Sequence, residues 1–118
     1  MKMTEQEAIK IIKRLKAYYP YLYKSITKDD AKEIVEVYQT QFKEIDSELV
    51  LLAIDNWAGK RITAPSIAEI KGSIGDLYYK FNQKYSELSN DEQTDPKEIE
   101  KISRWIDVAW TCMGYVIK

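Results

Sequence analysis

Histidine is absent from this sequence of 118 residues, and cysteine occurs once, as Cys112. Without histidine the chain lacks the commonest general base and the commonest metal ligand, so zinc sites and histidine-dependent triads are excluded. A single thiol forms no internal disulfide, which fits a reducing cytosol. We therefore interpret Cys112 as a small packed hydrophobic residue rather than as a reactive thiol.

Long apolar runs are also missing. The longest stretches, such as Leu49 to Ile54, are only a few residues long, whereas a membrane-spanning helix needs about 20. The N-terminus carries charges but no apolar core and no cleavage site, so we expect no signal peptide. The sequence therefore predicts a cytoplasmic protein that has no membrane partner.

An excess of charge of one sign is lacking as well, since 18 basic residues face 19 acidic residues and the formal net charge is −1. No global positive field draws the chain to nucleic acid, so we do not expect direct nucleic-acid binding. A local basic patch of Lys10, Lys13 and Arg14 keeps a small helical DNA-binding domain open as an alternative. A solvated outer face is the commoner meaning of such a patch.

The residue patterns of familiar catalytic sites are not found. Gly59 and Lys60 do not form a phosphate-binding loop, because Ile54 stands at the position of the first glycine and Arg61 at that of the hydroxyl residue. Adjacent carboxylates lie at helix starts and in loops, and no base is available to activate a serine or threonine. We expect a non-enzymatic protein with no catalytic residue, no cofactor and no metal.

Apolar residues at helical spacing and helix-capping residues are abundant. They predict an all-α fold, a small bundle of about five helices in a single domain over residues 1–118. Gly72 and Gly75 each cost about 1 kcal/mol in a helix interior, so they favour a break at 72–75. A polar loop at 89–95 precedes the C-terminal helix. The expected helices are about 4–19, 27–43, 46–58, 66–88 and 95–116, and the expected buried stripe of the second is Ala31, Ile34, Val35, Tyr38 and Phe42.

The C-terminal helix carries two adjoining apolar stripes that together cover about 200°, about twice the usual width. Either its own domain buries the helix on two sides, or one stripe packs inward and the other meets a partner or a second copy of the chain. Tryptophan is enriched at interface hot spots. The first stripe is Ile99, Ile102, Ile106, Trp110, Met113 and Ile117, and the second is Trp105, Val108, Cys112 and Val116. The predicted partner-binding residues are Trp105, Val108, Cys112 and Tyr115, with Tyr79 as a neighbour.

A motif order over about residues 1–70 points to a family. A capped first helix leads into Tyr18-Tyr19-Pro20, a second helix starts at Thr27, and a short basic linker after the third helix leads into the Ala-Pro-Ser-Ile-Ala-Glu-Ile of residues 64–70. This order resembles the phage replicative-helicase loader/inhibitor family, whose members are small helical proteins of phages and prophages of Gram-positive bacteria. Beyond Gly75 the chain departs from the family, whose members often end in a polar tail that engages the helicase.

The resemblance implies a protein that binds a hexameric replicative helicase, holds it inactive and hands it to an origin-bound initiator. It implies no ATPase activity, and a location in the host cytoplasm if the chain is phage-encoded. The residues leave another class open, a different phage or bacterial interaction module such as an inhibitor of a host enzyme or an assembly chaperone.

Overall fold

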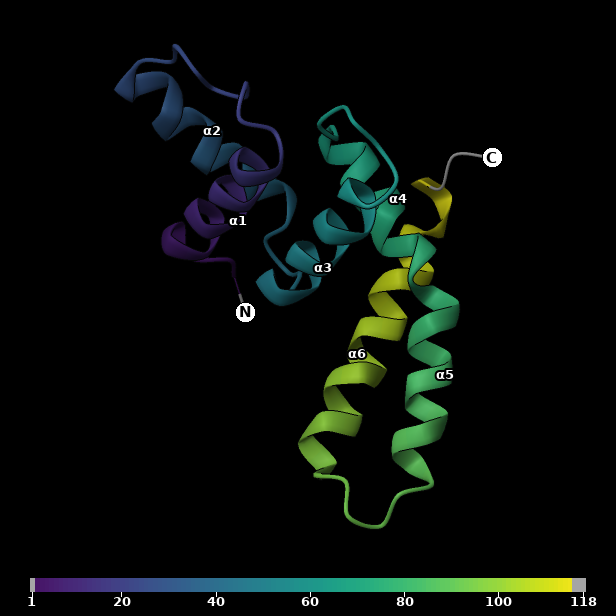
Figure 1. The fold of residues 1–118 in the computed structure, drawn as a ribbon. Helices are drawn as coiled ribbons and strands as arrows, with labels where there is room; N and C mark the ends of the chain where they lie inside the picture. The colour runs from purple at the N-terminus through teal and green to yellow at the C-terminus, as the bar shows by residue number, and fades with distance from the viewer. Residues whose placement is uncertain (1, 116–118) are drawn as a thin grey trace. The chain divides into compact units, whose positions relative to one another are not determined.

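The structure, a computed structural model, describes residues 2–115 and consists of helices joined by short connections (Figure 1). Within these residues there is no strand, so the predicted all-α fold is confirmed. The elements are α1 (Glu5–Tyr18), α2 (Lys28–Gln41), α3 (Ser47–Ala58), α4 (Ile67–Asp76), α5 (Tyr78–Ser89), α6 (Pro96–Cys112) and a final 3-10 turn, η1 (Met113–Tyr115).

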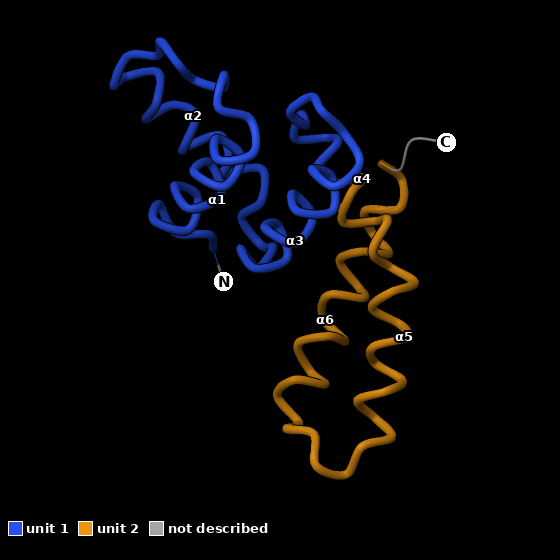
Figure 2. Tube along the Cα trace, in the orientation of Figure 1, with its two compact units in different colours: residues 1–70 blue, residues 71–118 orange. Residues whose placement is uncertain are grey.

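The chain divides into two compact units, unit 1 over residues 1–70 and unit 2 over residues 71–118 (Figure 2). The boundary falls inside α4. Compact units can belong to one domain or to two, so the single domain stays a prediction.

The helix starts follow the capping residues of the sequence. Thr4 and Glu7 form a capping box at α1: Thr4 N donates to Glu7 Oε1 at 2.9 Å, and Glu7 N donates to Thr4 Oγ1 at 3.1 Å. Ser66 and Glu69 repeat this pattern before α4, at 2.9 and 3.2 Å. Each box satisfies backbone N–H groups that the first turn leaves without partners.

Unit 1 has a core in which α1 packs against both α2 and α3. The largest fully buried side chains of α1 and α3 are Ile11, Leu15, Leu49, Val50 and Ile54, and Phe42 joins them from the position just after α2. The predicted stripe of α2 is only partly buried. Tyr38 and Phe42 are buried, whereas Ala31, Ile34 and Val35 stay partly exposed.

Unit 2 contains an antiparallel hairpin of α5 and α6 (Figure 1). The buried residues of α6 are Ile102, Trp105, Ala109 and Cys112, and α5 contributes Phe81. The spacing of three, four and three residues on α6 is that of a coiled-coil seam. This seam takes members from both predicted stripes, and the small side chain of Ala109 completes it.

The helix break lies at Leu77 and not at the predicted residues 72–75. Leu77 N donates to Ile74 O at 3.0 Å, which tightens the chain into a turn before α5 begins. Gly72 and Gly75 are buried inside α4, where tertiary burial outweighs their weak helix propensity. The helix predicted over 95–116 ends at Cys112 and continues as η1. Val116 and Ile117, each the last member of a predicted stripe, lie outside the described residues.

Replacing Glu7 by glutamine is expected to lower the free energy of unfolding by about 0.5–1 kcal/mol at pH 7. The Glu7 carboxylate accepts hydrogen bonds from Thr4 N and from Ser47 Oγ, the latter at 3.0 Å, and these lower its pKa. A lowered pKa in the folded state stabilises the protein above the unfolded pKa, and this stabilisation is lost as the pH falls through the folded value. Urea unfolding at pH 7 and at about pH 3 measures the difference.

Glu5 is a suitable control, since it lies in the same first turn without a hydrogen bond to Ser47. Glu5→Gln should have the smaller effect at pH 7. A Glu7→Gln effect of equal size at both pH values would contradict the assigned role of the carboxylate.

Candidate protein-binding surface

Three aromatic side chains of unit 2 gather at the start of α5 and near the end of α6. Tyr78 is half-buried, and its ring centroid lies 5.2 Å from that of Tyr79 and 5.3 Å from that of Trp110. Tyr79 is 74% exposed and Trp110 is 63% exposed. We call Tyr78, Tyr79 and Trp110 the aromatic patch.

The local structure explains why Trp110 is exposed. The seam of α6 ends with Ala109 and Cys112 facing inward, and a helix turns 100° per residue, so Trp110 points away from the seam. The turn at Leu77 ends α4 and places Tyr78 and Tyr79 in the first turn of α5. A large exposed indole next to a tyrosine pair is the composition of an interface hot spot.

The structure separates the five predicted partner-binding residues. Trp105 and Cys112 are buried, each 4% exposed, so the expectation that they lie on a contact surface is wrong. Val108 is half-buried, whereas Tyr79 and Tyr115 are exposed. Trp105 and Cys112 are buried because they lie on the same face of α6 as Ile102 and Ala109, and this face packs on α5.

Trp105 is held inside the hairpin by specific contacts. Its ring centroid lies 5.6 Å from that of Phe81 on α5, and Lys101 Nζ lies 5.1 Å from the ring. The indole therefore packs on an aromatic side chain and accepts a cation–π contact. These contacts give Trp105 a structural role.

Cys112 is a buried free thiol, as the interpretation of a packed hydrophobic residue predicts. Burial raises its pKa, an effect that the positive charge of Lys71 partly opposes. A raised pKa keeps the thiol protonated at neutral pH, which makes it a poor nucleophile.

Tyr115 lies on the final turn η1 and is 47% exposed. Lys71 Nζ lies 5.4 Å from the centre of its ring, so α4 contributes a cation–π contact that orients this tyrosine.

Tyr18 and Tyr19 of the family motif, and Tyr21 just after it, join parts of unit 1 by hydrogen bonds. Tyr18 Oη donates to Asp55 Oδ1 at 2.8 Å. Tyr19 Oη donates to Arg61 O at 2.9 Å, and Tyr21 Oη accepts from Ala64 N at 3.0 Å. The three side chains thus fasten the end of α1 and the turn after it to α3 and to the linker before α4.

Arg14 is part of the same network rather than of a free basic patch. Its Nη1 lies 2.8 and 2.9 Å from the two carboxylate oxygens of Asp55. The carboxylate of Asp55 thus already pairs with the guanidinium of Arg14 that would otherwise contact a phosphate. The patch predicted for DNA binding is therefore reduced to the two lysines, Lys10 and Lys13.

The described residues give no sign of a metal centre: residues 2–115 hold no group of three or more cysteine or acidic side chains that suits a metal ion. None of the helices in the same range combines the length and the apolar character that a bilayer crossing needs.

Fold and surface together define a small all-helical protein in which the family motifs fill unit 1 and the aromatic patch lies on unit 2. Residues 3–71 match the family model for the N-terminal domain of the helicase loader of phage SPP1. The match covers more than half of the chain, which therefore belongs to the family of this loader and is related to phage helicase loaders. The resemblance inferred from the sequence is confirmed. Neither the comparison with curated proteins nor that with solved structures gave a match.

The limits of the match agree with the division of the structure. The matched residues end at residue 71, and unit 2 begins there. The hairpin and its aromatic patch therefore lie outside the matched region.

Proposed function

We propose that this protein is a non-enzymatic factor of phage DNA replication that binds a hexameric replicative helicase and holds it inactive. It then hands the helicase to an origin-bound initiator in the host cytoplasm. The observation that carries the proposal is the match of unit 1 to the helicase-loader family. The sequence supports a binding role, because its Gly-Lys pair lacks the other residues of a phosphate-binding loop.

We further propose that unit 2 contacts the helicase through the aromatic patch. Tyr115, five residues after Trp110, is proposed as a further contact residue. Trp110 and Tyr79 are both exposed, and each contacts the ring of Tyr78. This supports the assignment, since tryptophan and tyrosine are enriched among the residues that dominate binding energy at protein interfaces. A folded hairpin needs less ordering on binding than a disordered tail does, so more of the contact energy is retained as affinity.

A stoichiometric inhibitor acts by binding one state of its target more tightly than the others. Adding the full chain to purified hexameric helicases of Gram-positive phages and their hosts should lower the ATPase rate of a cognate helicase. The rate should reach a plateau at a fixed ratio of chain to hexamer, and gel filtration should show the complex. An unchanged ATPase rate for every helicase at saturating protein would contradict the proposal. Heat-denatured protein serves as the control.

A further inference from the structure

An apolar groove with a basic rim runs along unit 1 between α1, α2 and the connector that joins them. It has a volume of about 840 Å³. Its apolar lining is Ile9, Ile12, Ile26, Ala31, Ile34 and Val35, and its charged lining is Lys13, Lys16, Lys24, Lys28 and Lys32 with Glu5 as the single acid. Ala31, Ile34 and Val35, the members of the α2 stripe that stay partly exposed, line this groove.

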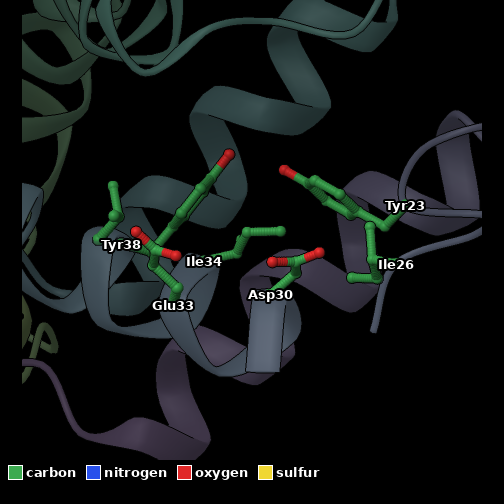
Figure 3. Close-up of a pocket in the computed structure, with 7 residues that line it drawn as sticks. Tyr23, Ile26, Asp30, Glu33, Ile34 and Tyr38 are labelled. Carbon is green, nitrogen blue, oxygen red and sulfur yellow. The ribbon is translucent and has the colours of Figure 1, made fainter. Parts of the chain in front are cut away.

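A second pocket of about 520 Å³ adjoins the groove, and the two share Tyr23, Ile26 and Ile34 (Figure 3). Asp30 and Glu33 line this second pocket. Figure 3 shows the hydroxyls of Tyr23 and Tyr38 pointing toward one another. The apolar surface therefore extends over both pockets, with the five lysines lining the larger one and the two carboxylates lining the smaller one.

The backbone of Tyr23 supports a binding role for this surface. Its φ of 56° lies in the left-handed region, which a bulky side chain rarely adopts. Backbone strain of this kind persists where the surroundings fix it, and it is common at ligand-binding sites. Here the strained residue is one that the two pockets share.

The lysines of the rim are available to a partner. All five are exposed, and within residues 2–115 none of them forms an ion pair with a carboxylate of the chain. Five unpaired cations around isoleucine side chains are complementary to a ligand that carries acidic groups beside an apolar surface.

We propose that this groove binds an acidic amphipathic helix of a partner protein, with the apolar stripe of that helix on the isoleucines and its carboxylates against the lysines. The inference concerns a surface of unit 1 and does not rest on the helicase binding proposed above. A helix fits because the described residues offer no strand edge for an extended peptide and only one aromatic ring, Tyr23, in the groove. The isoleucine floor distinguishes the site from a nucleic-acid groove, in which bases stack on aromatic side chains.

The probe is a synthetic helical peptide of about 15 residues with leucines at helical spacing and glutamates on both flanks. A second peptide carries lysines in place of the glutamates, and a DNA duplex is the third ligand. NMR spectra of the full chain with labelled isoleucine methyl groups report the site. The glutamate peptide should shift the methyl signals of Ile9, Ile12, Ile26 and Ile34 and leave those of the buried Ile11 and Ile54 in place.

Charge reversal gives the matched variants. The double variant Lys16→Glu/Lys28→Glu should weaken binding of the glutamate peptide at least about tenfold, which corresponds to about 1.4 kcal/mol. Lys10 and Lys43 lie outside the groove lining, so Lys10→Glu/Lys43→Glu should weaken binding of the glutamate peptide clearly less than Lys16→Glu/Lys28→Glu does. Circular dichroism confirms that both variants are folded.

Three results would overturn the inference. The first is the absence of groove methyl shifts with the glutamate peptide at millimolar concentration. The second is equal binding of the lysine peptide, and the third is tighter binding of the DNA duplex with the same lysine dependence.

Discussion

Replacing Trp105 by alanine is expected to lower the free energy of unfolding of unit 2 by about 3–5 kcal/mol, the range for a large aromatic side chain removed from a core. The substitution removes the ring contact with Phe81 and the cation–π contact with Lys101, and it leaves a cavity between α5 and α6. Chemical unfolding of the full chain followed by far-UV circular dichroism measures the loss. A hairpin that unfolds entirely in this variant also agrees with the prediction.

Trp110 supplies the matched control, because it is the same residue type on the same helix with the opposite exposure. Trp110→Ala should change the free energy of unfolding by less than about 0.5 kcal/mol, as exposed substitutions usually do. Fluorescence quenching gives an independent measurement. In a variant that lacks Trp57 and Trp110, the remaining indole of Trp105 should be shielded from iodide. Equal destabilisation by the two alanine variants would show that α6 packs in another register.

The local signals in the sequence predict most of the fold. Capping residues such as Thr4, Ser66 and Asp95 mark helix starts within one residue of those observed, because they act on backbone N–H groups that are next to them in the chain. The break at Leu77 is not predicted. Glycine propensity points to Gly72 and Gly75, but both are buried within α4, and burial is a tertiary property that propensity does not contain.

The register of α6 is the main error in the predicted site. A width of about 200° shows that α6 has two apolar faces but not which face packs on α5. The seam through Ile102, Trp105, Ala109 and Cys112 is recognisable once Ala109 is counted as a core residue. Alanine contributes a weak hydrophobic signal, and so the pattern favours the stripe with larger side chains at Ile106 and Trp110.

The two surfaces of this protein differ in chemistry. The groove of unit 1 has an isoleucine floor and a lysine rim, whereas the aromatic patch of unit 2 has tyrosine and tryptophan rings. No sequence pattern predicts the groove, because it arises from residues of α1, α2 and the connector that each look like ordinary core or solvent positions. Two surfaces of different chemistry suit the proposed function, in which one protein binds a helicase and hands it to an initiator.

Replacing Trp110 by alanine is expected to weaken binding to the cognate helicase at least about 30-fold, or about 2 kcal/mol, the threshold for an interface hot spot. Tyr79→Ala should weaken it about tenfold, since the ring contact that the described residues show between Tyr79 and the patch is the one with Tyr78. Isothermal titration of the full chain into the helicase hexamer measures both values. Because the side chains are exposed, these variants should keep the unfolding free energy of the parent, so the loss belongs to binding.

Tyr85 is the matched control for the patch, since it lies on α5 like Tyr79 and is 39% exposed. Within residues 2–115 it makes no ring contact with the patch. Tyr85→Ala should bind the helicase with the affinity of the parent. If Trp110→Ala also binds with parental affinity while the ATPase rate still falls, the helicase contact lies elsewhere on the chain and the loader role stands without the patch. If Tyr85→Ala weakens binding as much as Trp110→Ala, the contact extends along the whole exposed face of α5, and the patch is not its centre.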